Sequence, residues 1–134
     1  MVGLIESTEK LFAEALATMK KKNADYSGTK DGMKNFRISA QVANVKMSQD
    51  ILTRLTDKVT RIGNLIVKDA NVKDETIFDT IQDLINYAAI LHYAFQIELR
   101  DGTYKIIECT SDEKLNKYLN TDEVVGEELP PLEI

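Results

Sequence analysis

Three carboxylates in the middle of the chain have a spacing that could bind a metal ion. Glu75, Asp79 and Asp83 are separated by successive steps of four residues, so a helix would place them on one face. Carboxylate oxygens are the ligands that Mg²⁺ prefers in proteins. The pattern is therefore typical of a row of carboxylates that could hold Mg²⁺.

Basic residues occur at similar spacing on the preceding stretch. Arg54 and Lys58 are four residues apart, and Arg61 follows three residues later. Guanidinium and ammonium groups bind phosphate, so the two rows could form the floor of a pocket for a phosphorylated ligand. The alternative is a ladder of ion pairs between two helices, in which each exposed pair contributes about 0 to 1 kcal/mol. Composition does not choose between these two interpretations.

Apolar periodicity predicts the elements that would position these residues. Apolar residues recur at spacings of one, three and four along residues 50–66 and again along 75–97, which predicts two amphipathic helices. The connection at 68–73 is short enough to require an antiparallel return. A turn centred near residues 70 and 71 would oppose the following pairs: Lys58 with Asp83, Arg61 with Asp79 and Thr80, and Arg54 with Asn86 and Tyr87. We expect Asn86 and Tyr87 to bind the ligand as well.

Residues 23–37 form the least periodic stretch of the body and are predicted to be a surface loop, because glycines and small polar residues favour turns. The loop residues that could bind a ligand are Asn23, Asp25, Tyr26, Asn35, Phe36 and Arg37. In one interpretation, Tyr26 and Phe36 only anchor the loop to the core. In the other, the loop is a lid in which an aromatic ring stacks on a base and Arg37 binds a phosphate.

The remaining stretches complete a mainly α fold, an antiparallel helical bundle around the central hairpin. A first helix is expected from Ser7 or Thr8, as N-cap, to Lys22, and a short helix from Ile38 to Val45. Gly102 is expected to end the fourth helix or to form part of a turn. If that helix ends early, Gln96–Leu99 and Thr103–Cys109 could form one short β hairpin near residue 102. We expect a single domain over residues 1–119 and an extended acidic tail over 120–134.

Composition restricts the classes of partner. The chain has 134 residues and a net charge of −5, and residues 110–134 alone hold seven acidic residues and two lysines. The remaining part is therefore neutral, which argues against an extended nucleic-acid interface but not against a small anionic ligand. No apolar run approaches the roughly 20 residues that span a bilayer. The single cysteine, Cys109, fits a reducing compartment, and we expect a cytoplasmic protein.

Several separated motifs together resemble a known family. They are Lys22-Asn23-Ala24-Asp25-Tyr26, Asn35-Phe36-Arg37, Arg54, Asp57-Lys58, Arg61, Asp74-Glu75-Thr76-Ile77, Asp79-Thr80, Asp83-Leu84 and Asn86-Tyr87. In this order they resemble the nucleotide modification associated domain family, type 1, which is found largely in phage genomes beside genes for DNA base modification. This chain has Ser27 at the position where the family is expected to have glycine after the Asp-Tyr pair. The difference bears on the expected conformation of the loop and not on the resemblance itself.

The helical pattern is also similar to that of the MazG-like nucleoside triphosphate pyrophosphohydrolases. Those enzymes hold Mg²⁺ with a Glu-x-x-Glu pair on one helix and a Glu-x-x-Asp pair on the next. Here Glu75, Asp79 and Asp83 match the second pair passably, whereas the first helix offers only Asp57 beside Lys58. A lysine at that position would compete with a metal ion for Asp83. The resemblance therefore implies nucleotide binding more strongly than hydrolysis.

Three hypotheses for function follow. The first is a Mg²⁺-dependent pyrophosphohydrolase with Asp57, Glu75, Asp79 and Asp83 as metal ligands. The second is a binding protein without turnover that sequesters a nucleotide or a nucleotide-derived signal, such as a host defence signal, in the host cytoplasm. The third is a structural helical protein whose charged residues form only a ladder. Because a two-helix seam seldom closes a pocket alone, we also expect a homo-oligomer.

Overall fold

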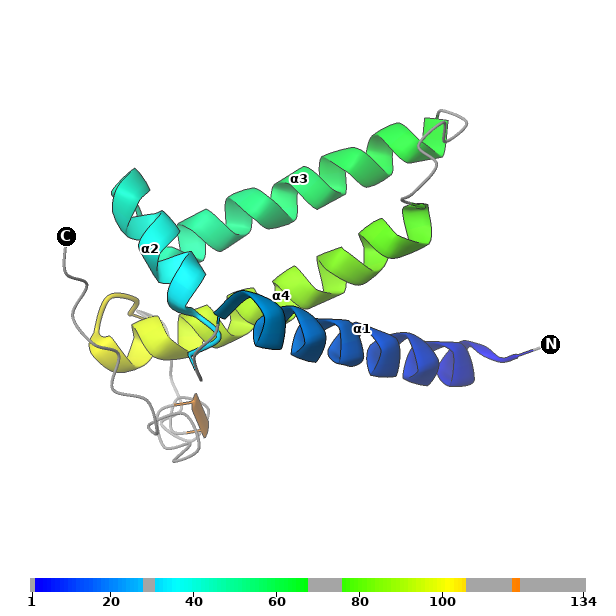
Figure 1. Ribbon diagram of the computed structural model, residues 1–134, viewed down its shortest axis with the longest axis horizontal. Helices are drawn as coiled ribbons and strands as arrows, with labels where there is room; N and C mark the ends of the chain where they lie inside the picture. The colour runs from blue at the N-terminus through cyan, green and yellow to red at the C-terminus, as the bar shows by residue number, and fades with distance from the viewer. Residues whose placement is uncertain (1, 28–30, 68–75, 106–116, 119–134) are drawn as a thin grey trace.

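The computed structural model describes residues 2–27, 31–67, 76–105 and 117–118. Within these ranges the chain forms four helices of ten or more residues (Figure 1). Their bounds are Leu4–Ser27 for α1, Lys34–Ala43 for α2, Met47–Val67 for α3 and Ile77–Asp101 for α4. The prediction of a mainly α fold is confirmed. The acidic tail and the predicted turn at 68–73 lie outside the described residues. None of the helices in the described ranges is long and apolar enough to cross a membrane.

The α3–α4 hairpin is the centre of the fold, as predicted, and its two helices run antiparallel (Figure 1). α1 packs on α4, α2 packs on α3, and α1 and α3 make little contact with each other. Ile51 is fully buried beside Met33 and Ala94. Phe36 and Tyr87 pack against this small core, so the core lies directly beneath residues that were expected to bind a ligand.

The ends of α4 follow local capping rules. Thr76 is the N-cap, and its side chain and that of Asp79 satisfy each other's backbone N–H groups in a capping box. Gly102 has a left-handed conformation with φ 82°, and the N–H of Tyr104 donates to the carbonyl of Glu98 at 3.0 Å. Because α4 continues to this cap, Gln96–Leu99 is helical. The candidate β hairpin does not form there, and residues 106–109 lie outside the described residues.

α1 is longer than predicted at both ends. The hydroxyl of Thr8 donates to the carbonyl of Leu4 at 2.8 Å, so Thr8 lies inside the helix and is not its N-cap. Residues 23–27 continue α1, and residues 34–37 begin α2. The predicted loop over 23–37 was therefore wrong for most of its length. The run of lysines before residue 23 favours helix, and no glycine interrupts α1 before Gly28.

Buried polar groups hold the helices in register. The side-chain amide of Asn86 donates to the carbonyl of Ala15 at 3.0 Å, which joins α4 to α1. Glu98, which is buried, accepts a hydrogen bond from the N–H of Ser48 at 3.0 Å in the first turn of α3. A carboxylate is favourable at that end of a helix because of the helix dipole. These two bonds set where α1 and α3 cross the long α4.

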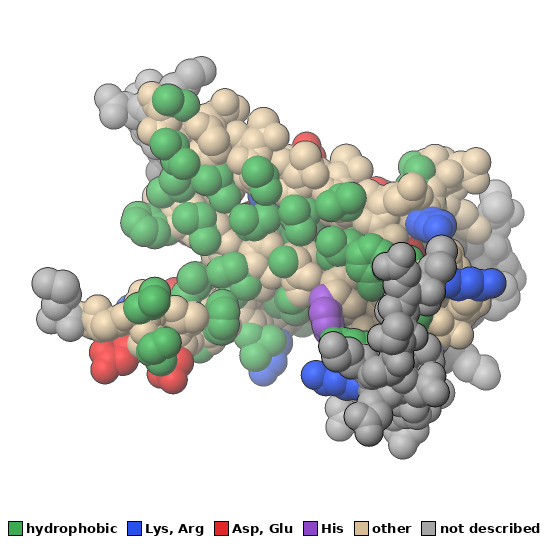
Figure 2. Space-filling model, turned by 180° about the vertical axis from the view of Figure 1, so that it is seen from behind, with side chains coloured by type: hydrophobic (Ala, Val, Ile, Leu, Met, Phe, Trp, Pro, Cys, Tyr) green, Lys and Arg blue, Asp and Glu red, His purple; other side chains and the backbone are tan. Residues whose placement is uncertain are grey.

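Many large hydrophobic side chains are not covered by the four helices. On the face that Figure 2 shows, hydrophobic side chains lie over the hairpin and over the arm formed by α1. Leu52, Val59, Ile66 and Phe78 are each exposed over half or more of their surface. Single exposed hydrophobics are normal, but a contiguous group marks an interaction surface.

Candidate functional site

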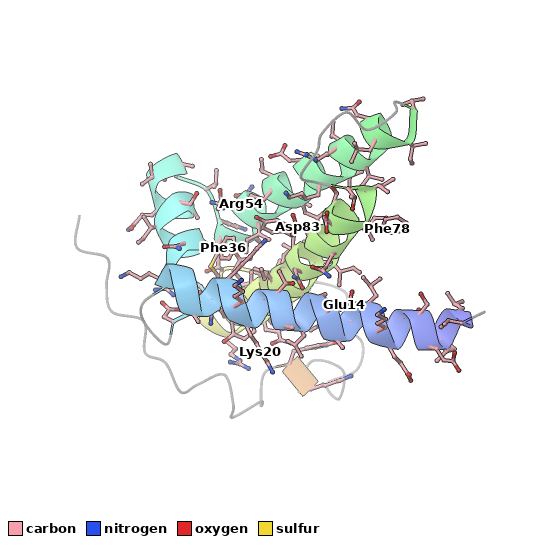
Figure 3. The ribbon with its side chains drawn as sticks, turned by 45° about the vertical axis from the view of Figure 1, so that its right-hand side comes forward. Glu14, Lys20, Phe36, Arg54, Phe78 and Asp83 are labelled. Atoms are coloured by element: carbon pink, nitrogen blue, oxygen red, sulfur yellow. The ribbon has the colours of Figure 1, made fainter. Side chains whose placement is uncertain are left out.

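Six side chains from all four helices form a connected group that we call the cation–aromatic cluster. Its members are Lys22 of α1, Phe36 of α2, Arg54 and Lys58 of α3, and Asp83 and Tyr87 of α4. Figure 3 shows Phe36, Arg54 and Asp83 in the region where α1, α2 and the hairpin meet. Each member of the group contacts at least one other member.

Asp83 binds two lysines that come from different helices. The Nζ of Lys22 lies 3.3 Å from Oδ1 of Asp83, and the Nζ of Lys58 lies 3.2 Å from Oδ2. The side chains of Lys58 and Asp83 are exposed by 24% and 19%, and that of Lys22 by 55%. Two ammonium groups thus share one carboxylate, which leaves one positive charge in excess at a site that solvent can reach.

The pairing of Lys58 with Asp83 was predicted from the register of the hairpin and is confirmed. The contribution of Lys22 was not predicted, because its contact with Asp83 depends on where α1 crosses α4. The lysine run 20–22 is also typical of the last turn of a helix, so the sequence alone does not single out Lys22. α1 instead continues to Ser27, which places Lys22 well inside the helix.

Two aromatic rings connect the lysines to Arg54. The Cζ of Arg54 lies 5.1 Å from the centre of the Phe36 ring, and the Nζ of Lys58 lies 6.0 Å from that of Tyr87. The two rings meet edge to face, with centroids 6.5 Å apart. Such cation–π and edge-to-face contacts each contribute about 0.5 to 1.5 kcal/mol. The rings therefore hold the cations in position.

Arg54 is also oriented by polar partners on its other side. Its Nη2 donates to Oγ of Ser39 at 3.1 Å, and its Nε lies 3.5 Å from Oδ2 of Asp50. The hydroxyl of Ser39 donates in turn to Oδ1 of Asp50 at 3.2 Å. The polar partners of Arg54 thus lie on α2 and on its own helix, and its position opposite Asn86 and Tyr87 stays a prediction.

Other residues expected to bind a ligand have structural partners. Nη2 of Arg37 lies 2.7 Å from Oδ2 of Asp31, and the other oxygen of Asp31 accepts from the N–H of Met33 at 3.0 Å. Arg37 thereby fastens the turn before α2. The amide of Asn86 is occupied by Ala15. The side chain of Asn23 lies against Gly32, where a Cβ atom would come within 2.6 Å of its Oδ1.

The remaining predicted residues are placed as follows. Asn35 is exposed on α2, and Arg61 is half-buried on α3. Asp25 and Tyr26 lie in α1, and their side chains are outside the described part of the structure. The structure therefore brings together four of the predicted ligand residues, namely Phe36, Arg54, Lys58 and Tyr87.

The predicted metal ligands do not converge within the described residues. Asp79 is engaged by Thr76 in the capping box, Asp83 is held by two lysines, and Asp57 is exposed on α3. Glu75 lies outside the described residues. No three Asp, Glu, His or Cys side chains in the described ranges are arranged to hold a metal ion. The described carboxylates alone do not assemble a Mg²⁺ site, and that site stays a prediction.

The capping role of Asp79 predicts a pH dependence of stability. Hydrogen bonds from the backbone N–H and then from the hydroxyl of Thr76 lower the pKa of Asp79 below its usual 3.8. Because the folded-state pKa is lowered, the stabilisation is present above the usual pKa and is lost as pH falls through the lowered value. We expect Asp79→Ala to lower the Tm at neutral pH and to lower it less below pH 3.8.

Circular dichroism melts of both proteins at the two pH values measure this effect. Asp57→Ala is the matched control, since it removes an exposed carboxylate of α3 that caps no helix. A Tm difference between parent and Asp79→Ala that does not shrink in acid would contradict the capping role.

The chain was compared with protein-family models, curated proteins and solved structures, and none of them matches. The resemblance to the nucleotide modification associated domain family therefore stays a prediction.

Proposed function

We propose that the chain binds a nucleotide or a nucleotide-derived phosphorylated molecule at the cation–aromatic cluster. The proposal rests on one observation: two lysines, Lys22 from α1 and Lys58 from α3, both bind the carboxylate of Asp83. A phosphate group carries more charge than a carboxylate and has more acceptor oxygens. It could therefore take the place of Asp83 as the anion that the two lysines share.

Asp83 has a definite role in this proposal. In the free protein it keeps two ammonium groups close together that would otherwise repel each other. A phosphate that binds these lysines must take them from the carboxylate of Asp83, which competes with it. Arg54, held over Phe36 and by Ser39, supplies a third cation for a neighbouring phosphate. The partly exposed rings of Phe36 and Tyr87 offer the apolar contact that a base requires.

The basic experiment measures binding and turnover together. The protein is incubated with a mixed pool of nucleotides, with and without Mg²⁺, and the solution and the denatured protein are then analysed separately. Intact nucleotide released on denaturation supports the binding function. Hydrolysis products would favour the pyrophosphohydrolase hypothesis, and the absence of both would favour a purely structural role.

Substitution of Asp83 distinguishes a phosphate site from a metal site, because the two sites predict opposite changes in nucleotide affinity. If the lysines bind phosphate directly, Asp83→Asn removes the competing carboxylate and is expected to tighten binding about three- to tenfold, which corresponds to an exposed or half-buried charge interaction of about 1 kcal/mol. If Asp83 were instead a Mg²⁺ ligand, the same substitution would weaken Mg²⁺-dependent binding. Calorimetric titration with ATP, with and without Mg²⁺, measures the difference.

Asp57→Asn is the matched control for this experiment. It removes the same charge from the residue next to Lys58, but the side chain of Asp57 is exposed on α3. A general effect of net charge would change both variants equally. Equal affinity of Asp83→Asn and Asp57→Asn would therefore contradict the proposed exchange of phosphate for Asp83.

A further inference from the structure

The exposed hydrophobic side chains of the hairpin form a stripe with a regular spacing. Leu52, Val59 and Ile66 are seven residues apart, which is close to two helical turns, so they share one side of α3. Phe78, in the first turn of α4, is 77% exposed, and Ile66 is 72% exposed. On the face of the hairpin that Figure 2 shows, several hydrophobic side chains lie close together.

This apolar side and the cation–aromatic cluster lie on different sides of α3. At about 100° of rotation per residue, Arg54 and Lys58, the members of the cluster on α3, lie about 140° and 100° from Val59 around the helix axis. The side of the hairpin that carries the cations and the side that carries the apolar stripe are thus separate. A partner could cover the stripe and leave the proposed ligand site accessible.

The arm formed by α1 extends the same surface. The first half of α1 diverges from the hairpin (Figure 1), and Phe12 and Leu16 are each exposed over half or more of their surface. In Figure 2 a notch opens between this arm and the hairpin, and hydrophobic side chains border it on both sides. The hairpin and the α1 arm together leave a position in the bundle that no helix in the described ranges fills.

The polar groups beside the stripe are compatible with burial. The hydroxyl of Thr53 donates to the carbonyl of Gln49 at 3.0 Å, and that of Thr56 donates to Leu52 at 2.9 Å. Their hydrogen atoms are already bonded within α3, so covering them would leave no unsatisfied donor. None of the residues of the stripe carries a charge. Such a surface can pack against an identical surface without repulsion, although the whole chain has a charge of −5.

The exposed apolar area approaches the size that a standard dimer interface requires. Fully burying one large aliphatic or aromatic side chain removes about 60 to 120 Å² of apolar surface from water. Six such side chains are half or more exposed here, namely Phe12, Leu16, Leu52, Val59, Ile66 and Phe78. Together they offer on the order of 200 to 400 Å², against about 450 Å² of apolar area on each partner of a standard interface. The half-buried residues between them, such as Leu55 and Ile62, can supply the rest.

We infer that two copies of the chain pair through this apolar side, so that two α3–α4 hairpins form a four-helix bundle. An interface with two-fold symmetry uses the same surface on both copies, as a stripe without charge allows. Bundles of this kind bury a seam of apolar residues spaced by three and four. Each copy keeps its cation–aromatic cluster on the outer side of the assembly.

Light scattering coupled to size-exclusion chromatography tests the inference on the full chain. The expected mass is twice the 15.1 kDa of one chain. The variant Val59→Lys combined with Phe78→Lys is expected to run at the mass of a single chain, with a dimer dissociation constant raised by more than about 100-fold, since each copy would have to bury two charges without partners. A parent protein with the mass of one chain would overturn the inference.

Val42→Lys is the matched control, because Val42 is 84% exposed but lies on α2, away from the stripe. It is expected to keep the parent mass. A second measurement does not depend on whether a variant folds: the Tm of the parent should rise with protein concentration, as for any dimer whose folding is coupled to association. A Tm independent of concentration, or an unchanged mass of the Val59→Lys, Phe78→Lys variant, would contradict pairing through this side.

Discussion

A variant that lacks both lysines around Asp83, Lys22→Ala with Lys58→Ala, is expected to bind ATP about 100- to 10,000-fold more weakly than the parent. Each charge-assisted hydrogen bond to a phosphate contributes about 1.5 to 3 kcal/mol, and 1.4 kcal/mol corresponds to a factor of about ten. Two such bonds would be lost at once. Titration calorimetry of the parent provides the reference, and competition with a labelled nucleotide extends the range for the variant.

The chain offers a closely matched control in Lys20→Ala with Lys21→Ala. This variant removes the same amount of charge, from α1 alone, but both lysines are exposed, and Lys20 points away from Asp83 in Figure 3. We expect it to bind ATP nearly as well as the parent. If both double variants lose affinity equally, binding depends on overall charge and not on the cluster.

The loss of both lysines also leaves the carboxylate of Asp83, which is only 19% exposed, without its two ion-pair partners. A decrease in Tm is therefore expected for the double variant, and Asp83→Asn in the same chain should recover part of it. Binding should stay lost in that triple variant, because the lysines are still absent. Recovery of both stability and binding would show that the first effect came from misfolding.

The hairpin and one of its ion pairs could be predicted because both depend on contacts between neighbouring elements. Apolar spacing within 50–66 and 75–97 predicted α3 and α4, and the short connection predicted the register that pairs Lys58 with Asp83. The sequence also contains the signal for the capping box of α4, Thr76 followed three residues later by Asp79. The spacing of Asp79 from Glu75 and Asp83 instead favoured its interpretation as a metal ligand. A carboxylate three residues after a threonine serves a capping box equally well.

What could not be predicted depends on how distant elements cross. Lys22 reaches Asp83 because Asn86 binds the carbonyl of Ala15 and Thr18 binds Gln82, which fixes α1 across α4. No periodic pattern encodes these contacts between residues more than sixty positions apart. The ion pair of Arg37 with Asp31 was missed for a different reason, since both residues were assigned to one irregular loop instead of a turn and a helix.

The small core beneath the cluster leads to the largest expected effect on folding. Ile51 is fully buried beside Met33 and Ala94, and the core cluster contains no other large aliphatic side chain that is fully buried. Ile51→Ala would remove its contacts and leave a cavity, which costs about 2 to 5 kcal/mol at such sites. That is a large part of the 5 to 15 kcal/mol that typically stabilises a folded domain.

Urea denaturation followed by circular dichroism, at one fixed protein concentration, measures this change in the free energy of unfolding. Ile38→Ala is the matched control, because it deletes the same carbon atoms from an isoleucine that is 37% exposed on α2, and it should cost less than half as much. Since Phe36 and Tyr87 pack against the core around Ile51, the cavity should also loosen the rings that support Arg54 and Lys58. Nucleotide binding measured on the folded fraction should therefore weaken in Ile51→Ala but not in Ile38→Ala. Unchanged affinity in both would show that the cations keep their positions without the rings.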